Sequence, residues 1–140
     1  MFSTQALRLA YGKTLMDDGS SLITSDGYTY ELPHGGYMVG GLAGETRIPL
    51  EICDANTFHT IWLKYATEVR KLLKESKLSG VSYAVGTWID KECIVFDVSE
   101  KVTHSRSAYA LCKERNEDAY YDVDASKSVF IEKDNDNAEA

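Results

Sequence analysis

The features that mark secreted, disulfide-rich and membrane proteins are scarce in this chain. Its 140 residues include three cysteines, and the odd number and wide spacing of Cys53, Cys93 and Cys112 argue against a disulfide framework and a zinc site. No apolar run approaches the roughly 18–20 residues that cross a bilayer. The N-terminal residues lack the pattern of a secretion signal, and no Asn-x-Ser/Thr acceptor is present. We therefore expect a cytoplasmic protein with free thiols and no membrane partner.

An excess of positive charge is also absent. The chain has 15 Lys and Arg against 22 Asp and Glu, and residues 116–140 alone carry two positive and eight negative side chains. Nucleic-acid binding depends on Lys and Arg replacing counterions, so direct binding of DNA or RNA is not expected. Such an acidic segment suits the basic surface of a partner protein, or it is only a solvated surface that keeps the protein soluble.

Motifs that carry catalysis are incomplete. Tyr11-Gly12-Lys13-Thr14 resembles the end of a phosphate-binding loop, but Leu7 stands where that loop needs another glycine. The glycine-rich Gly40–Gly44 has no following helix to complete an anion site, so a hairpin turn is expected there. Cys93 and Cys112 fall on a predicted strand and an apolar helix face, which are structural positions. No catalytic residue, cofactor site or metal site is therefore predicted.

The composition indicates one globular domain. The apolar share is 44% and the charged share 26%. Residues 1–33 are weakly patterned and rich in turn signals, which predicts a loosely ordered arm with at most one short strand or hairpin. The ordered domain is expected over residues 34–132, followed by an acidic, disordered tail over residues 133–140.

Helical periodicity is clear in two places. Over residues 55–76, Asp54 is a good N-cap and aromatic and aliphatic residues recur at helical spacing, so this helix should rest on the core. A shorter helix over residues 104–115 should bury Ala108, Leu111 and Cys112 and end at Asn116.

Strand patterns occur in three pairs. Residues 36–39 and 45–50 flank the glycine-rich turn, with Pro49 indicating an edge strand. Residues 81–89 and 93–98 flank a charged loop at 90–92, a register that would place Trp88 opposite Ile94 and Gly86 opposite Phe96. The last pair, residues 119–124 and 128–132, has its loop at 125–127. The order β-β-α-β-β-α-β-β predicts an α+β fold, a largely antiparallel sheet with two helices packed on one face.

The last strand pair supplies the candidate binding surface. In the expected register Tyr120, Asp122, Asp124 and Phe130 share one face. Aromatic anchors between charges are typical of binding surfaces, so these residues are predicted to contact the basic surface of a partner. The predicted partner-binding residues are Asp118, Tyr120, Asp122, Asp124 and Phe130.

A second interpretation is a small enzyme or a nucleotide- or metal-binding protein. Asp122 and Asp124 stand two residues apart on a predicted strand, a spacing that suits a divalent cation or paired acid-base roles. Asp97 and the polar helix start at His104 would complete that site if the fold brought them together.

Four stretches resemble small uncharacterised proteins of actinobacterial phages and mobile elements. They are Gly35–Val39, Gly86–Asp90, Phe96–Ser99 and Ala119–Asp122, within a resemblance over roughly residues 35–131. The resemblance implies only a context, that of an accessory protein of phage or mobile-element type, in which small acidic proteins often act on host proteins. The charge distribution and the lack of a catalytic set add the expectation of a non-enzymatic binding protein, an inhibitor of a host defence system being one example. The resemblance implies no catalytic residue.

Overall fold

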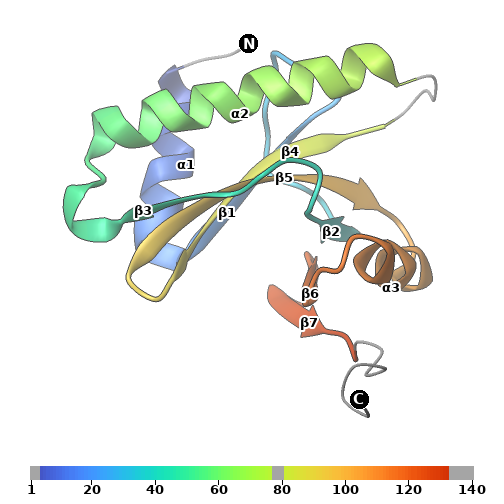
Figure 1. Ribbon diagram of the computed structural model, residues 1–140. Coiled ribbons are helices and arrows are strands. Elements are labelled where there is room, and N and C mark those ends of the chain that lie inside the picture. The colour runs from blue at the N-terminus through green and yellow to red at the C-terminus, as the bar shows by residue number, and fades with distance from the viewer. Residues whose placement is uncertain (1–3, 77–80, 133–140) are drawn as a thin grey trace.

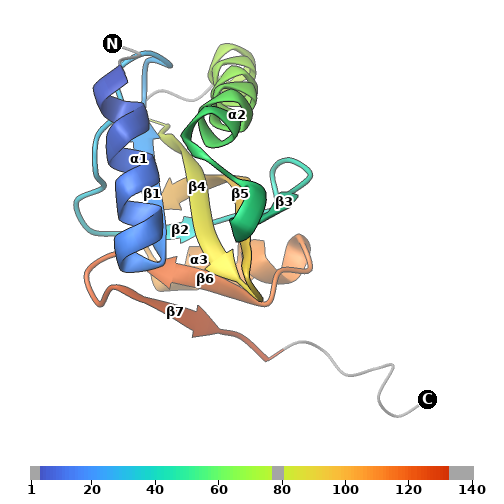
Figure 2. The same cartoon turned by 90° about the vertical axis from the view of Figure 1, so that its left-hand side faces the viewer.

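The computed structural model describes residues 4–76 and 81–132 and has the α+β architecture that the sequence predicts. Within these residues a seven-stranded antiparallel sheet has the order β1-β4-β5-β2-β6-β7, with β3 also paired to β5. Helices α1 and α2 cover the part formed by β1, β4 and β5, and α3 packs near β2 and β6 (Figures 1 and 2). The bounds are α1 Thr4–Asp17, β1 Gly19–Thr24, β2 Tyr37–Val39, β3 Thr46–Pro49, the 3-10 turn η1 Leu50–Ile52, α2 Ala55–Glu75, β4 Tyr83–Asp90, β5 Cys93–Val102, α3 Ser105–Glu114, β6 Ala119–Asp122 and β7 Lys127–Phe130.

Helix α2 anchors the main core, as its periodicity predicts. The Asp54 carboxylate accepts a hydrogen bond from the Thr57 N–H at 2.8 Å, which satisfies a backbone donor of the first turn. Phe58 and Trp62 are fully buried, and Phe58 lies 5.1 Å from the ring of Phe96 on β5. This core holds the largest buried side chains of the described chain, so it supplies most of the apolar burial.

The loosely ordered arm expected over residues 1–33 is wrong for Thr4–Asp17, which form α1. The short strand that the expectation included is present as β1, Gly19–Thr24. Helix α1 packs through Ala6, Leu7, Ala10 and Thr14 and leaves Leu9 and Met16 exposed. The Thr14 and Thr87 hydroxyl groups lie 2.6 Å apart and tie α1 to β4. Large apolar residues lie on both sides of α1, Leu7 on the core and Leu9, Leu15 and Met16 exposed, so the sequence shows almost no apolar periodicity and does not reveal this helix.

The β4–β5 hairpin exists as predicted, but its register differs by one residue. Its loop has two residues, Lys91 and Glu92, both with left-handed φ angles of 50° and 63°. Gly86 therefore lies opposite Asp97, not opposite Phe96, and Trp88 lies opposite Val95. Because a slip of one residue exchanges the two faces, Phe96 points to α2 and Asp97 to the other side of the sheet.

Strands β2 and β3 do not form the hairpin that was expected around Gly40–Gly44. Both pair with the same edge of β5: β3 with residues 93–96 and β2 with residues 100–102. Residues 40–45 connect β2 to β3 and run beside residues 97–99 of β5, which neither strand pairs with. Pro49 ends β3, which is an edge strand as predicted.

Helix α3 is confirmed and builds a second, smaller core. It buries Ala108 and Cys112 against Val39 of β2, with half-buried Tyr37 and Tyr120 around them. Asn116 follows in the left-handed conformation, with φ of 58°, and ends the helix where the sequence indicates. The predicted acidic tail, residues 133–140, lies outside the described residues.

Candidate functional site

The β6–β7 hairpin forms the margin of the sheet. Among the described strands, β7 pairs with β6 alone and forms one end of the sheet. Phe130 on β7 is 75% exposed, an unusual position for a large aromatic side chain. An isolated exposed apolar residue needs no functional explanation, but this one lies within an acidic segment.

The structure does not bring the predicted partner-binding residues onto one face. The loop of the hairpin is Val123–Ser126, with Asp122 opposite Lys127 and Tyr120 opposite Val129. Phe130 pairs with Ala119 and therefore points away from the side of Tyr120. Tyr120 instead packs inward, edge-to-face with Tyr37 at a ring distance of 5.6 Å.

The aromatic residue beside Phe130 is Tyr121, which the sequence did not single out. Both lie on the face of Ala119 and Ser128, at diagonal positions within reach of each other. Tyr121 is 37% exposed. We define the hairpin surface as Asp118, Tyr121, Asp122, Asp124 and Phe130. It differs from the prediction by the exchange of Tyr120 for Tyr121.

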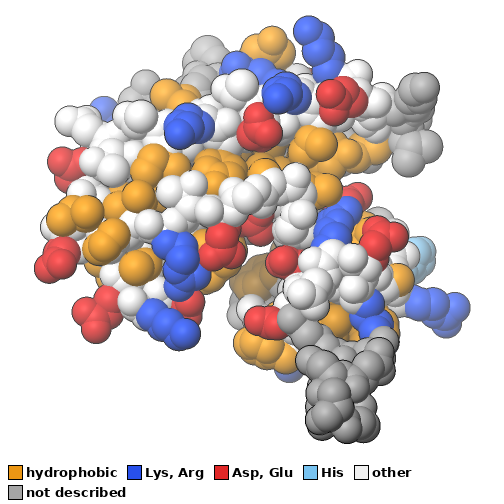
Figure 3. Space-filling model, in the orientation of Figure 1, with side chains coloured by type: hydrophobic (Ala, Val, Ile, Leu, Met, Phe, Trp, Pro, Cys, Tyr) orange, Lys and Arg blue, Asp and Glu red, His pale blue; other side chains and the backbone are white. Residues whose placement is uncertain are grey.

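The hairpin surface lies in the acidic part of the chain. Residues 116–132 carry one positive and five negative side chains, a net charge of −4. Figure 3 shows the molecule hollowed between the part with α2 and β3 and the part with α3, β6 and β7, with acidic side chains on both sides of the hollow. Such a surface attracts positive charge and repels phosphate groups.

The alternative site expected around Asp97, His104, Asp122 and Asp124 does not assemble. Asp124 lies in the hairpin turn, not on the strand, and the Asp122 carboxylate accepts a hydrogen bond from the Ala125 N–H at 3.1 Å. His104 is the exposed N-cap of α3, whereas Asp97 is buried on β5. Across residues 4–76 and 81–132, no three His, Cys, Asp or Glu side chains are arranged to hold a metal ion.

Cys53 and Cys112 are buried in the structure, in surroundings that disfavour a nucleophile. Burial raises the pKa of the Cys53 and Cys112 thiols, which disfavours the reactive thiolate. All three cysteines are free, as predicted.

Asp97 is the most perturbed acidic group on the sheet, and only 6% of its surface is exposed. It lies in the part of β5, residues 97–99, that pairs with β4 on one edge but with neither β2 nor β3 on the other edge. Its carboxylate accepts hydrogen bonds from the N–H groups of Val98 at 2.7 Å and Gly41 at 3.3 Å. It thereby satisfies backbone donors that the interrupted edge leaves unpaired. A Cβ atom on Gly40 would collide with the Asp97 carboxylate, so the crossing needs glycine there.

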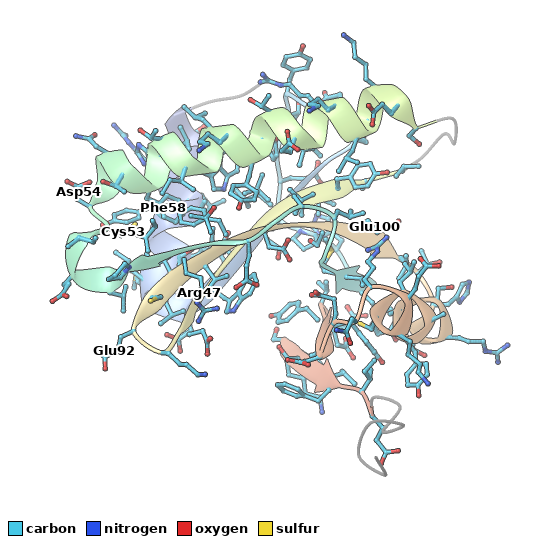
Figure 4. All side chains as sticks on the ribbon, in the orientation of Figure 1. Arg47, Cys53, Asp54, Phe58, Glu92 and Glu100 are labelled. Carbon is cyan, nitrogen blue, oxygen red and sulfur yellow. The ribbon has the colours of Figure 1, made fainter. Side chains whose placement is uncertain are left out.

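Burial raises the pKa of Asp97 to about 7, against the lowering effect of the two backbone donors. Glu117 and Glu45 act on it as like charges and raise the pKa further. The neighbouring Arg115 guanidinium is engaged by the Glu100 carboxylate (β5, Figure 4) and by the carbonyl groups of Val39 and Gly40. The protonated form of Asp97 is therefore favoured up to a higher pH than in an ordinary aspartate.

The residues that surround Asp97 were not foreseen as a group. Gly40 and Gly41 meet it in the crossing between β2 and β3, which follows from long-range pairing along β5, and Glu117 comes from the segment after α3. The only sequence signal was an aspartate inside an otherwise apolar strand, and its alternation with Phe96 and Val98 shows which face it occupies.

Comparisons with protein-family models, with curated proteins and with solved structures give no match. Among the described helices, none is both long and apolar enough to span a membrane.

Proposed function

We propose that this protein is a non-enzymatic binding protein whose hairpin surface contacts the basic surface of a partner protein. The observation that carries the proposal is Phe130, 75% exposed at the sheet margin in a hairpin that also carries Asp118, Asp122 and Asp124. An aromatic side chain supplies contact area, and the surrounding carboxylates supply charge complementarity. We further propose that the protein is an accessory protein of phage or mobile-element type and that its partner is a protein of the host.

The alternative, an enzyme or a nucleotide- or metal-binding protein, has less support because its four residues lie apart. Differential scanning fluorimetry of the full chain with divalent metals and nucleotides tests it directly, since a ligand of the native state raises the melting temperature. A rise with one of these ligands would favour the alternative.

The direct test is capture from a host lysate on the immobilised full chain, followed by mass spectrometry. The double variant Asp122→Lys, Asp124→Lys reverses charge on the hairpin surface and should lose the captured partner. The matched control, Glu51→Lys with Glu75→Lys, makes the same change in charge at exposed positions on η1 and α2 and should retain it.

Salt provides an independent arm of the same test. Raising the salt concentration to about 0.5 M shortens the Debye length to well below 8 Å and should weaken capture by the wild-type chain. A partner captured equally by the charge-reversed variant at all salt concentrations would overturn the hairpin surface as the binding site.

A further inference from the structure

Helix α1 turns a second group of apolar side chains away from the core. Leu9, Leu15 and Met16 are 42%, 45% and 85% exposed, although the opposite side of the helix packs on the main core. Figure 2 shows α1 at the near side of the molecule, with no other described helix or strand over it. Exposed apolar side chains that are grouped in this way mark an interaction surface, whereas single ones do not.

Gly12 lies at the centre of this side of α1. At 3.6 residues per turn, Leu9 and Leu15 stand about 60° to either side of it. A Cβ atom on Gly12 would meet no described residue within 4 Å, the backbone of its own helix aside, so packing within the chain does not require glycine there. Glycine lowers the stability of a helix, but it lets another backbone come close. We define the outer face of α1 as Arg8, Leu9, Gly12, Leu15 and Met16.

The outer face is complementary to a second copy of itself. Two antiparallel α1 helices related by a two-fold axis at Gly12 place Leu9 of each copy against Leu15 of the other. The same axis places the apolar stem of Arg8 over Met16 of the second copy, and the two Gly12 residues meet at the axis. Each contact is made twice, as in the symmetric interfaces of most homodimers.

Charge favours the same antiparallel arrangement. Arg8 is exposed and forms no ion pair within the described part of the chain, whereas Asp17 and Asp18 lie at the C-terminal end of α1. The antiparallel arrangement brings Arg8 of each copy to that end of the other helix, where the helix dipole is also negative. The Asp17 side chain is 58% exposed beside Lys13 and has the capacity to accept a second donor.

A lipid surface is a poorer fit to the outer face. Helices that lie on membranes are rich in Lys and Arg, whereas Thr4–Asp17 has only Arg8 and Lys13, with Asp17 against them. The net charge of this helix is therefore close to zero, and most of the negative charge of the chain lies in residues 116–140. Two copies of α1 consequently meet without strong repulsion.

We propose that this protein forms a two-fold symmetric dimer through the outer face of α1, with the two helices antiparallel and Gly12 at the axis. A helix of 14 residues is about 21 Å long, so the contact is smaller than the roughly 1,200–2,000 Å² of stable interfaces. The dimer should therefore be reversible and depend on concentration. It uses no residue of the hairpin surface and does not rest on the function proposed above.

The test is sedimentation velocity of the full chain from about 10 µM to about 1 mM, a range that covers the dissociation constants of weak dimers. The wild type should pass from monomer to dimer over this range. Gly12→Lys places two like charges at the axis and should raise the dissociation constant at least about tenfold. Because the place of its Cβ atom is open, this variant should melt at the temperature of the wild-type monomer or above it.

The matched control is Gly44→Lys, which makes the same change at a loop glycine where a Cβ atom also meets nothing within 4 Å. It should dimerise like the wild type, as should the double variant Asp122→Lys, Asp124→Lys on the hairpin surface. A wild-type chain that stays monomeric throughout, or a Gly12→Lys variant that dimerises like the wild type, would overturn the proposal.

Cross-linking tests the antiparallel arrangement. A mixture of Leu9→Cys and Leu15→Cys chains, treated with oxidised glutathione, should form disulfide-linked dimers of one chain of each kind. Either variant alone should form few, because equal positions away from the axis lie too far apart for a disulfide. The wild type, whose three cysteines are free, gives the background. Equal cross-linking with and without mixing would contradict the antiparallel dimer.

Vesicles distinguish the lipid alternative. The full chain is sedimented with vesicles of phosphatidylcholine and phosphatidylglycerol, beside the variant Met16→Asp. The dimer predicts that neither chain sediments with the vesicles. A monomeric wild type that binds the vesicles, with binding lost in Met16→Asp, would assign the outer face to a lipid surface and overturn the dimer.

Discussion

The two ends of the sheet differ in how they are built. Around β1, β4 and β5, helices α1 and α2 enclose a core that includes the fully buried Trp62, Phe58 and Phe96. Around β2, β6 and β7, α3 covers a core of three small or medium buried residues, and the hairpin carries exposed aromatic and acidic side chains. The first region therefore supplies most of the folding stability. In the second region, exposed side chains can be substituted without unfolding the chain.

The largest expected effect belongs to Trp62→Ala in the α2 core. Trp62 is fully buried and packs against Tyr30 at a ring distance of 5.0 Å, so its loss should cost about 3–5 kcal/mol. Urea unfolding followed by circular dichroism measures this change. Leu63→Ala, one position along and 37% exposed, is the control and should change stability little. Similar costs for both would show that the buried face of α2 is misassigned.

Asp97→Asn should have a strongly pH-dependent effect. Its folded-state pKa of about 7 lies above the usual value of 3.8, so the wild type loses stability as pH rises between these values. Between pH 5 and pH 8 this loss is about 2–3 kcal/mol, and the variant should escape it. Unfolding free energies of both chains at the two pH values give the comparison. Parallel pH profiles would mean that Asp97 titrates normally.

Tyr120→Ala tests the smaller core. Tyr120 is half-buried against Tyr37, so the variant should lose about 1–2 kcal/mol, less than Trp62→Ala. Tyr120→Phe keeps the ring and should recover most of that loss. A cost equal to that of Trp62→Ala, measured by the same urea unfolding, would remove the distinction between the two regions.

The smallest effect on stability is expected from Asp122→Lys with Asp124→Lys. Both side chains lie at or next to the hairpin turn, and surface substitutions usually change stability by less than about 0.5 kcal/mol. The Asp122 hydrogen bond to Ala125 is the one local contact that the variant removes. Melting curves that fall far below the wild type would show that the turn is part of the folded core.

The sequence predicts those elements whose side chains alternate between large apolar and polar types. Helix α2, helix α3 and the central hairpin are recognisable for that reason. α1 is hidden because its buried face is mostly small, Ala6, Ala10 and Thr14 beside Leu7, while the large apolar residues Leu9, Leu15 and Met16 are exposed. The pairing of β2 and β3 with successive parts of β5 depends on contacts distant in sequence, which local patterns do not encode.

The candidate site was predictable in location and not in detail. The acidic segment follows from the charge distribution, but the face on which each residue lies, that of Phe130 included, depends on the length of the turn. The loop begins at Val123, whereas a loop at residues 125–127 was expected, and this difference moves Phe130 to the side of Tyr121. The two-residue loop of the β4–β5 hairpin and the four-residue loop of the β6–β7 hairpin have no clear sequence signal. Their left-handed positions are occupied by Lys91, Glu92 and Ser126 and not by glycine.

Phe130→Ala, with unfolding and partner binding measured on the same preparation, tests the division between a stabilising region and a binding region most directly. The variant should unfold like the wild type and bind the captured partner at least about tenfold more weakly, because an exposed aromatic anchor contributes to binding and little to folding. Tyr109→Ala, which removes an exposed aromatic ring from α3, should change neither quantity. Wild-type affinity in Phe130→Ala would contradict the account.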